Sequence, residues 1–77
     1  MLEGARVIEF DAFDNAVMYA RERGGRIWQG YDDGRVVWFN PHMSMSLILT
    51  HVLCKGRGFV GSWRESIERR HQRLALH

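Results

Sequence analysis

The stretch Arg26–Asn40, "RIWQGYDDGRVVWFN", decides the fold because it holds two apolar runs separated by a turn signal. Asp33-Gly34 suits a two-residue type I′ turn, whose two central positions require positive φ. A two-residue turn at Asp33-Gly34 predicts an antiparallel hairpin in which Trp28 lies opposite Phe39. Alternation puts Trp28, Gly30, Val37 and Phe39 on one face, and Ile27, Tyr31, Val36 and Trp38 on the other. Both faces are apolar, so the second face is either covered by the C-terminal half or exposed as a contact surface.

The residues before the hairpin predict a strand and then a helix. Arg6–Phe10 alternates and is rich in β-formers, with Ile8 and Phe10 on one side. Asp11 is the expected N-cap of the following helix, and Gly24-Gly25 is its stop signal. A helical stripe follows at spacings of three and four: Phe13, Ala16, Val17 and Ala20.

The segment after Pro41 is apolar around most of its circumference. Met45–Lys55 predicts a helix capped by Ser44 or Ser46, and as a helix it should be the central buried element. A strand over the same residues stays open, because short apolar runs suit both structures. We expect one shared core made of Ile8, Phe10, Phe13, Val17, Ile48 and Val52.

A last helix is predicted from Trp63 onward. Ser62 and Glu65 have the S-x-x-E spacing of a capping box, and the preceding "GFVGSW" suits a short extended edge segment. The predicted fold is therefore a single α+β domain over residues 1–77. Its order is β-α-β-β-α with an antiparallel hairpin, and a basic C-terminal helix covers residues 62–77.

Length and cysteine content limit what kind of protein this is. A chain of 77 residues forms one small domain, and its single cysteine, Cys54, precludes an internal disulfide. The start lacks the pattern of a signal peptide, and the longest apolar stretch is too short for a membrane helix. We therefore expect a soluble cytoplasmic protein that does not enter a membrane.

Three patterns are typical of chemistry, but none predicts an enzyme. Gly56, Gly58 and Gly61 have G-x-G-x-x-G spacing, yet the chain is too short for a complete nucleotide-binding domain, so packing glycines are expected. His51 and Cys54 share a helix face and could bind zinc together with His42, but a second cysteine is absent. The same His51 and Cys54 could form a nucleophilic pair, but no orienting residue is recognisable, so both should pack on the mostly apolar helix. We expect no cofactor, no metal site and no catalytic residues.

Residue types favour protein binding. The chain has three Trp, two Tyr and ten Arg but one Lys, and Trp, Tyr and Arg dominate interface energies. Arginine also makes planar, bidentate contacts to carboxylates. The predicted contact residues are the hairpin rings and those of the last helix: Trp28, Tyr31, Trp38, Trp63, Arg64, Arg69, Arg70 and Arg73.

The opening "RVIEFDAFDNAVMYARERGGRIWQGYDDGRVVWFNP" resembles the compact β-α-β-β lead of small phage or prophage proteins that block host machines. These include anti-CRISPR proteins and phage inhibitors of RNA polymerase. The resemblance covers about half of the chain and implies steric blocking of a host protein or protein–nucleic-acid complex. The chain differs from acidic DNA-mimicking inhibitors because its net charge is +2.

Two alternatives stay open. Residues 1–39 have a charge balance of −2 and residues 40–77 one of +4, so the basic half suits direct contact with nucleic acid, with Trp63 or Phe59 stacking on bases. The other alternative is a structural homo-oligomer, a homodimer for example, that uses spare apolar surface between copies.

Overall fold

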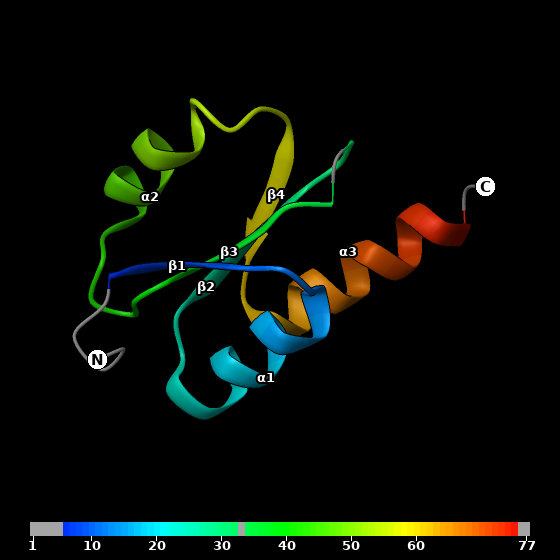
Figure 1. Ribbon diagram of the computed structural model, residues 1–77, viewed down its shortest axis with the longest axis horizontal. Coiled ribbons are helices and arrows are strands. Elements are labelled where there is room, and N and C mark those ends of the chain that lie inside the picture. The colour runs from blue at the N-terminus through cyan, green and yellow to red at the C-terminus, as the bar shows by residue number, and fades with distance from the viewer. Residues whose placement is uncertain (1–5, 33, 76–77) are drawn as a thin grey trace.

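The chain folds into one antiparallel sheet with helices on both of its faces (Figure 1). The computed structural model describes residues 6–32 and 34–75. The elements in chain order are β1 (Val7–Phe10), α1 (Phe13–Arg23), β2 (Arg26–Gly30), β3 (Val36–Phe39), α2 (Met45–Val52), β4 (Gly58–Gly61) and α3 (Trp63–Ala75). The predicted α+β class is confirmed, and the extended segment before the basic helix is a fourth strand.

The sheet has the strand order β1-β3-β2-β4, with every neighbouring pair antiparallel. The hairpin strands β2 and β3 therefore form its centre, and β1 and β4 form its edges. Central strands with both faces covered read as continuous apolar runs, as Val36–Phe39 does. The same hairpin that directed the sequence interpretation thus forms the middle of the fold.

The predicted hairpin register is wrong by two residues. Trp28 lies opposite Val37 instead of Phe39. The amide of Gly30 donates to the Arg35 carbonyl at 2.8 Å, which leaves a four-residue connection in place of the expected two-residue turn. Gly34 has φ of 72°, whereas Asp33 lies outside the described residues. Because side chains alternate with period two, a shift of two residues keeps each ring on its predicted face, so the hydrophobic pattern could not separate the two registers.

The core is split between the two faces of the sheet, so the prediction of one shared core is wrong. On one face, α1 and the start of α3 pack against Ile27, Val36 and Trp38. On the other face, Ile48 and the half-buried Val52 of α2 join a separate cluster. That second cluster contains Trp28, Val37, Phe39 and Met43. A sheet with two apolar faces needs a cover on each of them.

The α1 helix buries the predicted stripe but begins without the predicted cap. Phe13, Ala16, Val17 and Ala20 are all buried. Ala12, in extended conformation, is the N-cap, and no side chain caps the helix, so Asp11 as N-cap is wrong. The chain enters the helix one residue later than expected. Gly24 ends the helix as predicted, with φ of 77° and its amide bonded to the Ala20 carbonyl.

Residues 45–52 are helical, which settles the alternative between helix and strand. Ser44 is the N-cap, and its Oγ accepts from the Leu47 amide at 3.3 Å. The expectation that this helix is the central buried element is wrong, since Ile48 is its single buried residue. The reason is that Trp28, Phe39 and Met43 already fill most of that face. One helical side chain completes the layer.

The α3 helix begins with the predicted capping box. The Ser62 amide donates to Glu65 Oε1 at 2.8 Å, and the Glu65 amide donates to Ser62 Oγ at 3.2 Å. Ser66 faces the sheet and is fully buried, while Gln29 Nε2 donates to its carbonyl at 2.7 Å. None of the described helices combines the length and the apolarity that crossing a membrane requires.

Candidate functional site: two contact surfaces

Two of the predicted contact residues belong to the core. Trp28 is 1% exposed and Trp38 is 2% exposed, so neither ring is available to a partner in this structure. Trp38 Nε1 donates to the Gly24 carbonyl at 2.8 Å and ties the hairpin to the end of α1. Both indoles are buried because the sheet is covered on both sides. Their expected exposure is therefore wrong, and their role is in folding.

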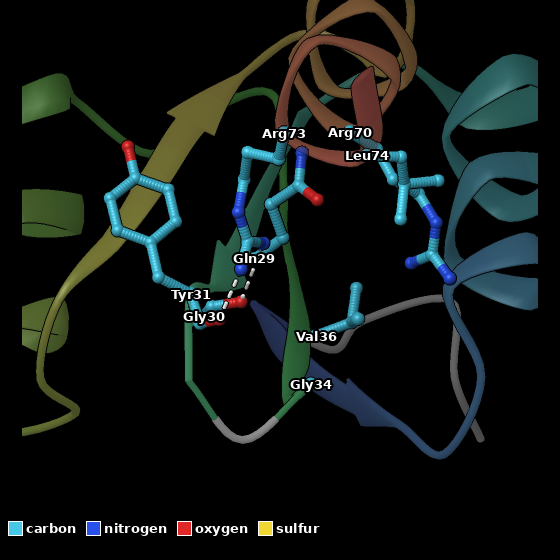
Figure 2. A pocket seen from close by; sticks show the side chains of 8 residues that line it. All are labelled: Gln29, Gly30, Tyr31, Gly34, Val36, Arg70, Arg73 and Leu74. Carbon is cyan, nitrogen blue, oxygen red and sulfur yellow. Dashed lines mark hydrogen bonds between the residues drawn. The ribbon is translucent and has the colours of Figure 1, made fainter. Parts of the chain in front are cut away.

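Tyr31, Arg69 and Arg73 are brought together at the end of β2. Arg73 donates to the carbonyls of Tyr31 and Gly30, the latter at 3.4 Å, and its guanidinium lies 4.8 Å from the Tyr31 ring centre (Figure 2). Arg69 donates to the Tyr31 hydroxyl at 3.3 Å and lies over the Phe59 ring. Arg73 therefore links α3 to β2 within the fold, in addition to any contact that it makes with a partner.

Trp63 and Arg64 lie at the opposite end of α3. Ten residues separate Trp63 from Arg73, which is about 15 Å along a helix. The Trp63 ring is half-buried, with the guanidinium of Arg64 at 4.7 Å and that of Arg21 at 5.4 Å. The predicted contact residues therefore do not form one continuous surface.

Arg70 and Arg73 lie on the sheet side of α3, and the outer side of this helix carries charges of both signs. At 100° per residue, Ser66 marks the sheet side, with Arg70 and Arg73 close to it in angle. Glu68 and Arg64 are on the opposite side, so both charges face outward there. Because Arg70 and Arg73 face the sheet, α3 presents no continuous outward row of arginines for phosphates over its described residues, which disfavours it as a nucleic-acid helix.

Arginine side chains cover most of the aromatic rings. Such contacts occur roughly once per 70–80 residues in proteins, and the described residues hold seven. The pairs are Arg21–Trp63, Arg23–Tyr19, Arg35–Trp28, Arg64–Trp63, Arg69–Phe59, Arg70–Phe13 and Arg73–Tyr31. Base stacking on Phe59 or Trp63 would have to displace a guanidinium. The preference for Arg over Lys therefore has a role inside this fold.

The sequence interpretation missed an exposed apolar surface on α2. Met45, Leu49 and Leu53, at spacings of four residues along α2 and its C-cap, are 40%, 50% and 81% exposed. Residues at this spacing lie on one side of a helix, so they form a continuous ridge, here named the α2 stripe. Leu47, also exposed, lies on another side of the helix. A helix that is apolar all round gives no sequence signal for which side is buried.

The surroundings of the α2 stripe carry no negative charge along the chain. Residues 43–54 contain no Asp, Glu, Lys or Arg. The next charged residues are Lys55 and the exposed Arg57, and the exposed His51 is on α2 itself. The stripe is thus an uncharged apolar ridge, followed by Arg57 and by Lys55, whose charge is paired with Glu9.

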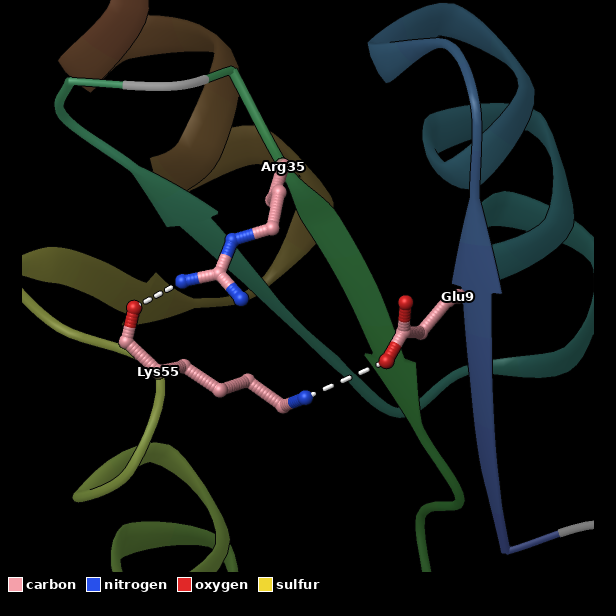
Figure 3. Close-up of polar contacts among 3 residues, drawn as sticks. All are labelled: Glu9, Arg35 and Lys55. Atoms are coloured by element: carbon pink, nitrogen blue, oxygen red, sulfur yellow. Dashed lines mark hydrogen bonds and ion pairs between the residues drawn. The ribbon is translucent and has the colours of Figure 1, made fainter.

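A small polar cluster attaches the end of α2 to the sheet (Figure 3). Lys55 Nζ lies 3.2 Å from Glu9 Oε2 on β1, and Arg35 donates to the Lys55 carbonyl. The Arg35 guanidinium also lies 5.4 Å from the Trp28 ring centre. This cluster, here called the Glu9–Lys55 clasp, closes one end of the α2 face where α2 itself provides little burial.

The residues considered for metal chemistry lie apart from any such site. His42, His51 and Cys54 are all exposed, so the expectation that His51 and Cys54 pack into an apolar environment is wrong. Within residues 6–32 and 34–75 no three His, Cys, Asp or Glu side chains are grouped as metal ligands would be.

Gly58 and Gly61 are packing positions, as expected, whereas at Gly56 the backbone conformation is what favours glycine. A Cβ at Gly58 would lie 2.3 Å from Trp28 Nε1, and one at Gly61 would lie 2.7 Å from Phe59 Cε2. Gly56 has φ of 100°, which favours glycine. Gly58 and Gly61 let β4 approach the rings of the sheet.

Comparisons with protein-family models, curated protein sequences and solved structures find no match to this chain. Its function is therefore inferred from the geometry described above.

Proposed function

We propose that this protein is a non-enzymatic binding module that docks the α2 stripe onto another protein. The observation that supports it is the exposure of Met45, Leu49 and Leu53 on a helix with one buried residue. Contiguous apolar surface of this kind marks interaction sites in folded proteins, and a short helix with such a ridge suits an apolar groove.

The proposed partner has an apolar groove with carboxylates on its rim. The stripe has no charge of its own, and Lys55 and Arg57 follow it directly. Opposite charges at the rim favour association and orient the partner. We further propose that binding blocks a larger host complex sterically, of the CRISPR-effector or RNA-polymerase kind that the sequence resemblance suggests. The single exposed thiol of Cys54 suits a reducing, cytoplasmic setting for this activity.

The test compares two exposed apolar residues on opposite faces of the molecule. A tagged chain captures the partner from its native host, and surface plasmon resonance measures binding of purified variants. Leu53→Asp should weaken binding by at least about 2 kcal/mol, as loss of an interface hot spot does. Met18→Asp is the matched control, because Met18 is 57% exposed but lies on α1. Equal binding by wild type and Leu53→Asp contradicts the proposal.

Two further measurements test the two alternatives that the sequence left open, a homo-oligomer and direct contact with nucleic acid. Sedimentation equilibrium tests the homo-oligomer: a dimer that Leu53→Asp converts to a monomer would assign the stripe to a second copy of the chain. A salt titration against single-stranded oligonucleotides tests direct nucleic-acid contact, which falls steeply with salt concentration. The mixed charge on the outer side of α3 predicts weak binding in that titration.

A further inference from the structure

We infer that a hollow beneath the C-terminal half of α3 binds a carboxylate with a neighbouring apolar group, presented by an acidic segment of a protein partner. The hollow, here called the α3 notch, has a volume of about 220 Å³ and lies between α3 and the hairpin end (Figure 2). Arg70 and Arg73 extend from α3 on either side of it, and Val36 lies below.

The α3 notch is positively charged and its charge is not compensated within the described chain. Its described lining holds two arginines and no acidic residue, and the adjoining hollow beside Tyr31 adds Arg69, again without an acidic residue among its described lining. Neither ion pair found within residues 6–32 and 34–75 involves these arginines. Two guanidinium groups that line one hollow, with no carboxylate among its described lining, favour a bound anion.

Arg70 is the residue placed to hold that anion. Arg73 is engaged by the carbonyls of Gly30 and Tyr31, which leaves it fewer donors. Arg70 makes one described contact, with its guanidinium 4.7 Å from the Phe13 ring centre. The contact with Phe13 leaves the N–H groups of Arg70 able to donate two parallel hydrogen bonds to a carboxylate.

The other wall of the α3 notch is apolar, which favours a protein ligand. Leu74 is one turn beyond Arg70 and remains 64% exposed, and Val36 is buried beneath. A volume of about 220 Å³ is below the usual 300–1,000 Å³ of small-molecule sites, so it suits one or two side chains more than a nucleotide. The mixed charge on the outer side of α3 also opposes a continuous phosphate track.

This site is independent of the α2 stripe. The stripe lies on the face covered by α2, and the notch lies on the face covered by α1 and α3 (Figure 1). The two proposals therefore fail or hold separately. A protein with both sites contacts a partner, or two partners, on both sides of one thin sheet.

The experiment uses the full chain and measures amide chemical shifts by NMR during titration with short blocked peptides. One peptide carries Glu-Leu, a second carries Gln-Leu, and a third ends in a free leucine carboxylate. We expect the two carboxylate peptides to shift the amides of Gly34, Val36 and Arg70 and the Gln-Leu peptide to shift none of them. A stronger response to one carboxylate peptide identifies a side-chain or a chain-terminal carboxylate as the natural ligand.

Variants then assign the effect to Arg70. Arg70→Gln should weaken peptide binding about tenfold, the usual loss for one charge-assisted hydrogen bond. Arg64→Gln, at the other end of α3, and Leu53→Asp, on α2, should both bind as wild type does. Thermal melting checks that each variant is folded, and Arg70→Lys tests whether the planar fork is needed in addition to charge.

Several results overturn the inference. Equal shifts from the Glu-Leu and Gln-Leu peptides would show that charge is irrelevant, and an equal loss in Arg64→Gln would show that the attraction is nonspecific. Absence of shifts with both carboxylate peptides also overturns it. Tighter binding of single-stranded oligothymidylate, with a steep dependence on salt, would assign the arginines to phosphates instead.

Discussion

The two faces of the sheet are covered in different ways. On the α1/α3 face, α1 alone buries four residues against the hairpin, and Trp63 and Ile67 of α3 extend the layer. On the α2 face, the helix buries Ile48 alone, and rings of the sheet together with Met43 make the rest. Since apolar burial is the main source of stability, the α1/α3 face should maintain the fold. The α2 face retains apolar surface that is free for binding.

The largest expected effect comes from the α1/α3 face. Trp38→Ala should lower the free energy of unfolding by about 3–5 kcal/mol, the usual loss for a buried aromatic residue. The ring packs edge-on against Tyr19 with centres 4.7 Å apart, and its Nε1 holds the Gly24 carbonyl. Urea denaturation followed by circular dichroism measures the change.

Trp63→Ala is the matched control on the same face, because its ring is half-buried and should lose less than Trp38→Ala. An equal loss for the two variants would show that depth of burial does not set the stability of this face.

The second prediction concerns a variant that destabilises the packing of α2 on the sheet. Ile48→Ala should cost about 2 kcal/mol, near the low end for a buried Ile→Ala change, because a helix held by one buried residue can detach without opening the sheet. Hydrogen exchange should rise in α2 while β2 and β3 stay protected. Leu49→Ala, one residue along and exposed, should change stability by less than about 0.5 kcal/mol. Loss of protection throughout the sheet in Ile48→Ala would make the two faces equivalent.

Local sequence signals were sufficient to predict the structure of a segment wherever one residue pattern corresponds to one structure. The stripe of α1 has helical spacing, and the alternation in β1 separates Ile8 and Phe10 from Val7. The S-x-x-E capping box of α3 forms with both of its hydrogen bonds. These features depend on residues within one or two turns of each other, so sequence reasoning could predict them.

Sequence reasoning failed where the pattern is degenerate. Two hairpin registers that differ by two residues place Trp28 and Val37 on the same face, so alternation cannot choose between them. The apolar run of α2 gives no side preference, so the exposure of Leu49 and Leu53 depends on how much of the sheet face is already filled. The α3 notch likewise required the three-dimensional placement of Arg70 beside Val36.

The third prediction concerns a variant that stabilises α1, on the α1/α3 face. Ala12 is the N-cap of α1, with extended φ and ψ of −132° and 139°, and provides no side-chain cap. Ala12→Asp should stabilise the domain by about 1 kcal/mol, since Asp at this position accepts from the first free amides. Calorimetry should find the melting temperature raised by about 4–8 °C. Asp11→Ala should leave it nearly unchanged, and a drop comparable to the Ala12→Asp gain would mean that Asp11 caps the helix after all.

The smallest expected effect concerns the Glu9–Lys55 clasp at the edge of the α2 face. Glu9→Gln should cost about 0.2–1 kcal/mol, because the Glu9 side chain is 68% exposed and exposed ion pairs contribute little. The loss should shrink as salt rises, since dissolved ions screen charges that face water. Glu22→Gln is the control, because the Glu22 side chain is 71% exposed, much as Glu9 is, and lies 4.0 Å from Arg23 on α1, far from α2. Urea denaturation of both variants at low and high ionic strength measures the difference.

A salt-independent loss above about 1 kcal/mol for Glu9→Gln would mean that the clasp acts as a buried interaction. In that event polar contacts, more than Ile48, would hold α2 on the sheet, and the contrast between the two faces would be one of chemistry as well as of buried area.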